Sequence, residues 1–260
     1  YKSYTLKQAG WKLLEGNAIQ IGTQKYRYFK SRAIKGTVKT VTIKRDALGD
    51  IYLYFVCETA ENEVLARTGK SVGYDFGLTQ FLTASDGNDR EAPLFFKANA
   101  AAIRRAGKAL ARKKQGSNHR KRARLALARL HKKTANQRKD FHFKLAHAIC
   151  EEYALVCIED LNLRGMQKRW GRKISDYGFA AFVEILKHQA SKTGTTIQTI
   201  DRYYASSQTC HICGAQNPKT KDLRVREWIC SHCGAIHDRD RNAAKNILKV
   251  GASTFFGEAS

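Results

Sequence analysis

The chain has 260 residues and carries 47 Lys and Arg against 23 Asp and Glu, a formal net charge of +24 with histidine neutral. Hydrophobic residues make up 43% and aromatic residues 10% of the sequence, which excludes a disordered basic tail and suffices for one or two packed domains. So large a positive charge favours a polyanionic partner, because each phosphate that Lys or Arg neutralises releases condensed counterions. Nucleic acid is the leading candidate, and an anionic membrane surface or a ribosomal setting is the alternative.

The sequence shows neither a membrane span nor a signal segment. No apolar run approaches the ~20 residues that a transmembrane helix needs, and no charged-then-apolar stretch opens the chain. Seven cysteines are an odd number, and four of them form two close pairs, which favours a metal site in a reducing compartment over a disulfide framework. We therefore expect a soluble, cytoplasmic protein.

Residues 1–70 are predicted to be rich in β-structure. Apolar and polar residues alternate over 38–43 and 51–56, and the polar stretch 46–50 separates them. This pattern is typical of a β-hairpin.

A second set of strands follows. Residues 72–85 predict two short strands broken at Gly77, and a turn leads to a third strand near 94–96. The apolar run 154–158 is typical of a buried strand, and 195–200 predicts another.

Between 98 and 149 the pattern becomes helical and strongly basic. A break at 116–118 divides the segment into two helices, and Asp140 is its only acidic residue. Charged helices that face only solvent usually mix both signs of charge, so this hairpin favours contact with a nucleic-acid backbone over a solvated surface. The residues predicted to bind nucleic acid are Arg104, Arg105, Arg112, Lys121, Arg122, Arg124 and Arg129.

The order of elements predicts the fold class. A polar loop over 162–173, an amphipathic helix over 179–190 and a last helix over 240–250 complete the series. The order is three antiparallel strands, a helix, a strand, a helix, a strand and a helix. This is the ribonuclease H-like (RNase H-like) α/β order, a mixed sheet flanked by helices. A cysteine-rich insert interrupts this order before the final helix.

Four cysteines form two CxxC pairs, Cys210 with Cys213 and Cys230 with Cys233, and sixteen residues separate the pairs. This spacing lets four thiolates converge on one zinc ion, and the glycine after each pair permits a tight turn. The histidine inside each pair is an alternative ligand. The other three cysteines lie in apolar contexts and are expected in the core.

Three acidic residues are the candidate catalytic group. Asp75 lies between apolar neighbours on the first strand of the mixed sheet, where a charge needs a cation or partners. Glu159 ends the fourth strand, which lies beside the first in this topology, and Asp240 begins the last helix. Clustered carboxylates suit magnesium or manganese, and two such ions would activate water for phosphodiester hydrolysis. Singly, each acid has an ordinary alternative: a capped turn, a strand-end surface charge, a helix N-cap.

At these motifs the sequence resembles the TnpB (OrfB) family of insertion-sequence-encoded proteins, relatives of the type V CRISPR effector nucleases. The matching segments are 72–78, 157–163, 206–210 with both cysteine pairs, and 238–248. The resemblance runs over essentially the whole chain.

The resemblance implies a split RuvC nuclease domain in which Asp75, Glu159 and Asp240 bind Mg²⁺ or Mn²⁺. It also implies a Zn²⁺-binding insert that contacts target nucleic acid, and RNA-guided cleavage of DNA beside a short motif. Guide RNA and target DNA are then the partners, near the prokaryotic nucleoid. Because the family carries a longer N-terminal portion, we expect this chain to begin at Tyr1 partway through a β-barrel wedge domain.

Four domains follow from this interpretation. They are a partial wedge domain over 1–70, RuvC-like segments I and II over 71–205, a zinc ribbon over 206–237 and RuvC-like segment III over 238–260. Two other functions stay open: a transposase that performs strand transfer with the same acids, and a zinc-containing DNA- or RNA-binding regulator without catalysis.

Overall fold

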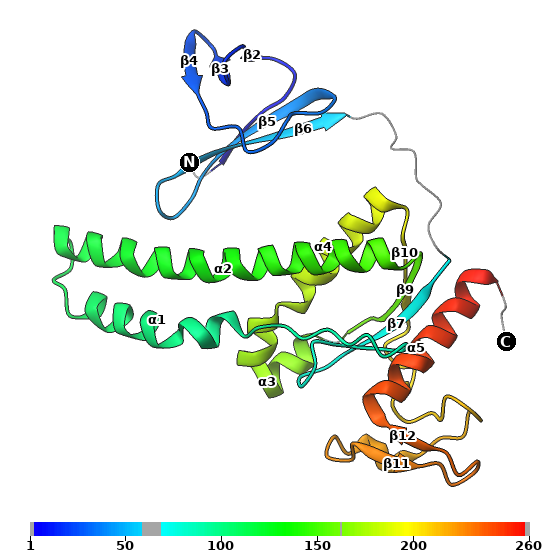
Figure 1. Cartoon of the computed structure of the whole chain (residues 1–260). Helices are drawn as coiled ribbons and strands as arrows, with labels where there is room; N and C mark the ends of the chain where they lie inside the picture. Colours follow the sequence, from blue (N-terminus) through cyan, green and yellow to red (C-terminus); the bar gives the residue numbers. More distant parts are fainter. Residues whose placement is uncertain (1–2, 59–68, 162, 258–260) are drawn as a thin grey trace. The chain divides into compact units, whose positions relative to one another are not determined.

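The structure is a computed structural model of the chain (Figure 1). The residues that it describes are 3–58, 69–161 and 163–257. They divide into two compact units, which are Tyr1–Glu63 with Ala102–Lys132 and Val64–Ala101 with Lys133–Ser260.

The first unit contains two three-stranded antiparallel sheets, in the orders β1-β5-β6 and β2-β3-β4. The strands are β1 (Ser3–Leu6), β2 (Trp11–Leu14), β3 (Ala18–Ile21), β4 (Gln24–Arg27), β5 (Thr37–Arg45) and β6 (Ile51–Glu58). The pairing of β5 with β6 confirms the hairpin that the alternating sequence predicts.

A lysine of α2 (Asn118–Glu152) fixes the β5–β6 turn. Nζ of Lys132 donates hydrogen bonds to Oδ2 of Asp46 at 2.7 Å, to Oδ2 of Asp50 at 2.9 Å and to the hydroxyl of Tyr52 at 2.6 Å. These acceptors hold the pKa of Lys132 above its ordinary value. Lys132 therefore has a structural role, and acidic side chains of the turn compensate its charge.

The second unit is built on a four-stranded mixed sheet of order β10-β9-β7-β8. Strands β9 and β10 run parallel to β7, and β8 runs antiparallel to it. The strands are β7 (Ser71–Phe76), β8 (Leu82–Ala84), β9 (Leu155–Glu159) and β10 (Thr196–Ile200). The remaining helices of the chain are α1 (Phe95–Ala111), α3 (Leu163–Tyr177), α4 (Phe179–Thr193) and α5 (Arg239–Phe256). The mixed α/β sheet and the helical hairpin are confirmed.

The strand predicted near 94–96 is wrong. Arg90, bridged to Leu82, is the only continuation of the sheet beyond β8 among the described residues, and α1 begins at Phe95. The buried Asp176 explains this helix start, because its carboxylate accepts hydrogen bonds from the backbone N–H groups of Phe96 at 2.7 Å and Lys97 at 3.0 Å. An N-terminal cap from a residue so distant in sequence is invisible to local patterns.

The loop predicted over 162–173 is also wrong, because most of this stretch is the first part of α3. Met166, Trp170, Ile174 and Tyr177 recur at helical spacing and pack against the main core. Non-helical backbone angles at Trp170 kink the helix. Tertiary packing of these four side chains stabilises a helix in a sequence whose polar residues suggest a loop.

Both faces of the mixed sheet are covered, which explains the apolar character of its strands. On one face, Val72, Tyr74 and Phe76 of β7 pack with Phe179 and Phe182 of α4 in the larger core. On the other face, Leu155 and Cys157 of β9 pack with Ile247 of α5. Of the three cysteines expected in the core, Cys150 and Cys157 are buried and Cys57 is half-buried.

A small cysteine-rich lobe precedes α5. It contains a short 3-10 helix at Pro218–Lys221 and the antiparallel pair β11 (Glu227–Ile229) and β12 (Ile236–Asp238). Strand β12 runs directly into α5, so the lobe and the helix share one continuous backbone. No helix in the described part of the chain combines the length and apolar character needed to cross a membrane.

Candidate metal centres and nucleic-acid interface

Two of the three candidate catalytic acids face α5. A Cβ on Gly73 of β7 would lie 2.6 Å from the backbone nitrogen of Leu248, and a Cβ on Gly251 of α5 would lie 2.5 Å from Sγ of Cys157 of β9. Because side chains alternate between the faces of a strand, Asp75 and Glu159 point to the same side as Gly73 and Cys157. Helix α5 therefore covers the sheet face that carries both acids (Figure 1).

The register of the parallel strands brings the two acids to one level. Tyr74 pairs with Ile158, and Asp75 and Glu159 are the residues that directly follow this pair. Both carboxylates thus lie at the carboxyl ends of neighbouring parallel strands, the edge of an α/β sheet where ligands bind. The predicted adjacency of the first and fourth strands is confirmed.

Asp240 joins the acids from the first turn of α5. The N-cap of this helix is Asp238, whose Oδ1 accepts from the backbone N–H of Arg241 at 2.7 Å, so the N-cap explanation for Asp240 is wrong. The Asp240 carboxylate instead forms ion pairs with Nη1 of Arg226 at 2.7 Å and Nη2 of Arg239 at 3.2 Å. The positive charges of these two arginines therefore partly compensate the negative charge of Asp240.

Burial and neighbouring acidic side chains raise the pKa values of two of the three acids. Burial, followed by the negative charges of Asp240 and Glu159, raises the pKa of Asp75 to about 7. Burial, with a smaller contribution from Asp160, raises the pKa of Glu159 to about 7. Shifts of this size mark carboxylates whose ionised form is unfavourable without a compensating positive charge.

The donor set of this cluster fits hard divalent cations. All three side chains offer carboxylate oxygens, the ligands that Mg²⁺ and Mn²⁺ prefer. Among the described residues, only the four cysteines bring three or more potential ligand atoms within 4.8 Å of one another, so the acids do not enclose one tight single-ion site.

The second candidate centre is the predicted cysteine cluster. The Sγ atoms of Cys210 and Cys233 lie 3.8 Å apart, and those of Cys213 and Cys230 lie 3.6 Å apart. Four Zn–S bonds of about 2.3 Å in a tetrahedron require sulfur separations of roughly 3.8 Å. The thiols therefore already have the spacing of a tetrahedral zinc site.

Backbone geometry prepares the cysteines as ligands. In each pair a glycine with positive φ turns the chain, and the N–H of Gly214 and Gly234 donates to the carbonyl of Cys210 and Cys230 at 2.9 Å. Backbone N–H groups of Cys233 and then His232 lower the pKa of Cys230 to about 6. This favours the thiolate of Cys230, the form that binds zinc. Against the opposing effect of the Ala215 and Ala235 N–H groups, burial and neighbouring thiols raise the pKa values of Cys213 and Cys233.

Two asparagines attach the cysteine-rich lobe to α5. Nδ2 of Asn242 donates to the carbonyl of Thr209 at 2.7 Å, and Nδ2 of Asn246 donates to the carbonyl of Ser206 at 2.8 Å. Oδ1 of Asn242 accepts from the backbone N–H of His211 at 3.0 Å. The sequence places both asparagines in the 238–248 motif but gives no sign of this role.

Sequence patterns also missed Arg226 and His237, which lie beside the acids and the cysteines. Arg226 is one of several basic residues in a polar stretch, and its contact with Asp240 depends on tertiary structure. Its position just before the second cysteine pair is the only sequence signal.

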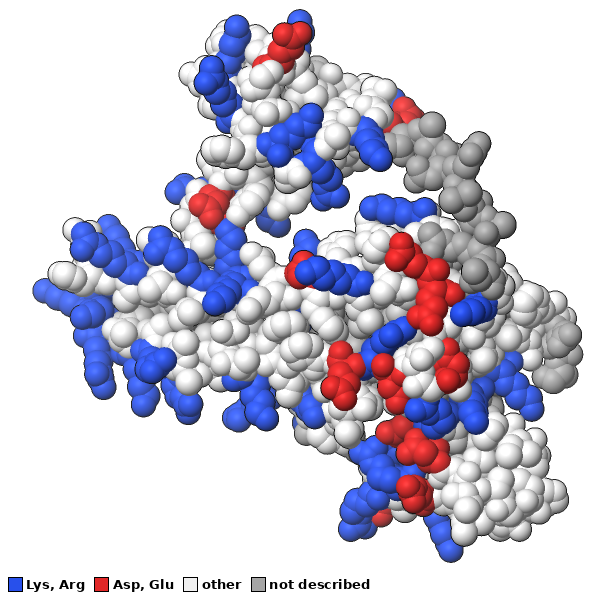
Figure 2. Space-filling model, in the orientation of Figure 1, with Lys and Arg blue, Asp and Glu red and all other residues white. Residues whose placement is uncertain are grey.

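The seven residues predicted to bind nucleic acid are all exposed; six lie on α1 and α2, and Arg112 lies in the turn directly after α1. None of them has an ion-pair partner within the described ranges. Figure 2 shows Lys and Arg side chains projecting from the helical hairpin, with few acidic side chains among them. An unpaired basic surface of this kind is available to bind phosphates.

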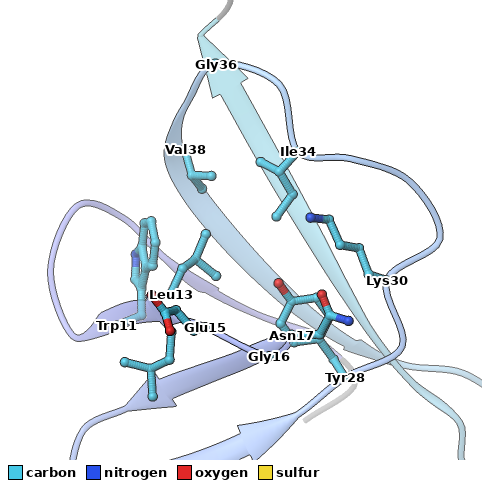
Figure 3. A pocket seen from close by; sticks show the side chains of 11 residues that line it. Trp11, Leu13, Glu15, Gly16, Asn17, Tyr28, Lys30, Ile34, Gly36 and Val38 are labelled. Atoms are coloured by element: carbon cyan, nitrogen blue, oxygen red, sulfur yellow. The ribbon is translucent and has the colours of Figure 1, made fainter.

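The first unit also carries a shallow cavity of about 540 Å³ (Figure 3). Trp11 stands on one side of it and Lys30 on the other, and Tyr28 contributes a second aromatic ring. Aromatic rings can stack on a nucleobase, and a neighbouring cation can bind the phosphate of the same nucleotide.

The chain is similar to known proteins over most of its length. Residues 54–169 match the OrfB_IS605 family, described as a probable transposase, and residues 179–247 match the Cas12f1-like TNB domain. The chain is 37% identical over 214 residues to a Streptomyces pristinaespiralis protein named "Putative RNA-guided DNA endonuclease", covering 82% of this chain and 52% of that protein. It is 28% identical over 265 residues to TnpB-like protein L79 of Acanthamoeba polyphaga mimivirus, covering 94% of this chain and 50% of the relative.

The structure resembles the Cas12f1 chain of a Cas12f1–sgRNA–target DNA complex, with a TM-score of 0.53, 17% identity and coverage of 81% of this chain and 45% of that one. That likeness concerns the fold. The chain is thus similar to OrfB_IS605 proteins over 54–169 and to a TNB domain over 179–247. Its relatives are named as TnpB-like proteins or putative RNA-guided DNA endonucleases, so it resembles the TnpB (OrfB) family. It spans about half the length of the curated relatives it matches.

Proposed function

We propose that the protein is the nuclease part of an RNA-guided DNA endonuclease of an insertion element, with a RuvC-type centre. The observation that carries the proposal is the placement of Asp75 and Glu159 at the carboxyl ends of neighbouring parallel strands, on the sheet face covered by α5, whose first turn carries Asp240. Burial raises the pKa of Asp75 and of Glu159 to about 7. The name of the Streptomyces pristinaespiralis relative supports the same activity.

In this proposal Asp75 and Asp240 flank the metal ions and Glu159 binds one of them. Bound Mg²⁺ or Mn²⁺ supplies an activated water and stabilises the leaving oxygen in phosphodiester hydrolysis. The protein's own groups hold and orient the ions, and Arg226 and Arg239 balance the charge of Asp240. Zn²⁺ binds the four cysteines as a structural ion.

Guide RNA and target DNA are the proposed partners. The unpaired basic residues of α1 and α2 hold the nucleic-acid backbone, which requires charge but no sequence reading. Base pairing between guide and target then selects the sequence, as in related effectors. We propose that 1–70 belongs to a wedge domain, 71–205 and 238–260 to the RuvC-like nuclease, and 206–237 to the zinc ribbon.

Incubating the protein and its copurifying RNA with matched duplex DNA and Mg²⁺ tests the proposal. Cut ends support hydrolysis, joined products support strand transfer, and retention of DNA without cutting supports a binding-only regulator. Asp75→Asn, Glu159→Gln and Asp240→Asn should each abolish cutting while binding persists. Asp222→Asn, which removes an exposed acid paired with Arg224, is the control and should cut normally.

Substantial Mg²⁺-dependent cutting by any of the three acid variants would remove that residue from the catalytic group. If the parent protein cuts neither matched nor mismatched DNA but still binds it, the nuclease proposal fails.

A further inference from the structure

We propose that His237 is a positioning residue that donates a hydrogen bond to the zinc-bound thiolate of Cys210. Through this contact, zinc binding fixes the position of the first turn of α5, where Asp240 lies. The proposal rests on the proposed function for the role of Asp240. Its first step, the effect of His237 on zinc binding, is independent of that function.

The His237 side chain is buried against the cysteine cluster. Only 4% of His237 is exposed, and its Nε2 lies 3.1 Å from Sγ of Cys210. A zinc-bound thiolate has no proton to donate, so Nε2 carries the hydrogen and donates to sulfur. A charge-assisted hydrogen bond of this kind stabilises the thiolate and fixes the direction in which it binds the metal.

Packing fixes the orientation of the imidazole. Its ring centroid lies 4.6 Å from that of Trp228 and 4.9 Å from that of His211. Trp228 is also the residue that pairs with His237 between β11 and β12. The ring is thus held by both strands of the lobe and by the first cysteine pair.

The backbone joins His237 to the acid centre over a very short path. His237 is the middle residue of β12, Asp238 caps α5, and Asp240 lies in the first turn of that helix. The N–H of Arg239 also donates to the carbonyl of Arg226 at 2.7 Å. Any movement of His237 on zinc loss is therefore transmitted to the helix start within three residues.

This path works together with the contacts that attach the first cysteine pair to α5. His211, inside that pair, binds Asn242 through its backbone N–H at 3.0 Å. Thr209 and His211 therefore attach the first cysteine pair to α5, and His237 lies two residues before the helix begins. Bound zinc would connect the first cysteine pair to His237, because Cys210 is both a proposed zinc ligand and the partner of His237.

Two variants of the full chain separate the hydrogen bond from packing. His237→Phe keeps an aromatic ring between Trp228 and His211 but has no donor, whereas His237→Gln offers an N–H at the position of Nε2. His232→Phe is the matched control, because His232 lies in the second cysteine pair but is exposed. Circular dichroism checks that each variant is folded.

The first measurement is the zinc dissociation constant, by competition with a chelating dye. We expect His237→Phe to raise it about 10–100-fold, His237→Gln to recover most of the loss, and His232→Phe to match the parent. The cobalt-substituted proteins should show the sulfur-to-cobalt charge-transfer band shifted in His237→Phe and restored in His237→Gln.

The second measurement is amide hydrogen exchange over residues 239–246 with zinc present. Faster exchange in His237→Phe than in His237→Gln or the parent supports the link to the start of α5. Parental zinc affinity in His237→Phe, or equal losses in the Phe and Gln variants, overturns the proposal. Unchanged exchange with weakened zinc overturns the link to Asp240. None of these readouts requires cleavage, so they fail or succeed separately from the nuclease proposal.

Discussion

Asp75, one of the three proposed catalytic acids, lowers the stability of the metal-free fold. Burial and its acidic neighbours raise its pKa from 3.8 to about 7, so the ionised carboxylate destabilises the metal-free fold. Asp75→Asn should therefore increase the free energy of unfolding at pH 8 in EDTA by about 2 kcal/mol. Added Mg²⁺ should stabilise the parent and have little effect on the variant. Urea denaturation with and without Mg²⁺ measures both effects.

The sign of this effect follows from linkage. As pH rises from about 4 to about 7 the unfolded chain has already released the Asp75 proton while the folded chain retains it, so the parent loses stability in this window. The advantage of Asp75→Asn should grow over the same window. Asp140→Asn, which removes an exposed acid of α2, serves as the control. An equal gain in that control, or a destabilised Asp75→Asn, would contradict the interpretation of Asp75 as a functional acid.

His142 gives the second prediction at the level of single residues. It is buried, stacks on Phe81 at 5.9 Å, and its Nε2 donates to the carbonyl of Tyr177 at 2.9 Å. Burial lowers its pKa from 6.5 to about 4, despite the opposing effect of the Tyr177 carbonyl. Between pH 6.5 and 4 the unfolded chain binds a proton at His142 that the folded chain does not bind. His142 therefore lowers the free energy of unfolding by about 3 kcal/mol across that window.

His142→Gln retains a donor for the Tyr177 carbonyl but does not titrate. The difference in unfolding free energy between parent and variant should therefore shrink as pH falls from 6.5 to 4. Comparing the two proteins cancels the carboxyls, which titrate in both. A difference that stays constant with pH would show that His142 has the same pKa in the folded protein as in the unfolded chain.

At the scale of elements, the contact between α5 and β7 depends on the absence of a side chain at Gly73. A Cβ there would lie inside contact distance of the Ala244 carbonyl and 2.6 Å from the Leu248 nitrogen, both backbone atoms. Gly73→Ala should thus destabilise the fold by about 3 kcal/mol and move the helix that carries Asp240. Thermal unfolding and cleavage assays should both detect the change.

Gly107→Ala is the matched control for that substitution. Gly107 lies inside α1, and a Cβ there would meet nothing within 4 Å. Alanine should stabilise the helix by about 0.5–1 kcal/mol and leave cleavage unchanged. If Gly73→Ala behaved like Gly107→Ala, α5 would not be held to the sheet by this close approach.

Elements with a local signature were predictable. Alternation identified β5 and β6, a short apolar run identified β9, and the strand predicted over 195–200 is β10. The cysteine spacing identified the cluster that the Sγ distances now support. The elements that sequence patterns missed depend on distant partners. Helix α1 begins at Phe95 because Asp176 caps it, and α3 forms because its apolar residues reach the core.

The candidate site divides in the same way. Asp75, Glu159 and Asp240 were identifiable because each lies at a recognisable strand or helix position. Arg226 and His237 were not, since an arginine in a polar stretch and a histidine in a short strand have no pattern of their own. Their roles arise only when the cysteine-rich lobe folds beside α5.

At the scale of the whole molecule, the excess of positive charge matters most where it is not neutralised internally. Lys132 binds Asp46 and Asp50, so its charge is already compensated. Lys121, Arg122, Arg124 and Arg129 on the same helix are exposed and have no ion-pair partner in the described part of the chain. These four residues are therefore the best test of whether the net charge of +24 serves nucleic-acid binding.

Replacing all four with glutamine should weaken binding to every DNA or RNA sequence alike, because phosphate contacts carry no sequence information. The slope of log affinity against log salt should fall by roughly 3, since each lost phosphate contact contributes about 0.7–0.9. The control exchanges Lys and Arg at the same positions, which keeps every charge and should keep the slope. Filter binding at several salt concentrations measures it. An unchanged slope in the glutamine variant would mean that α2 is a solvated basic surface and that other residues bind the backbone.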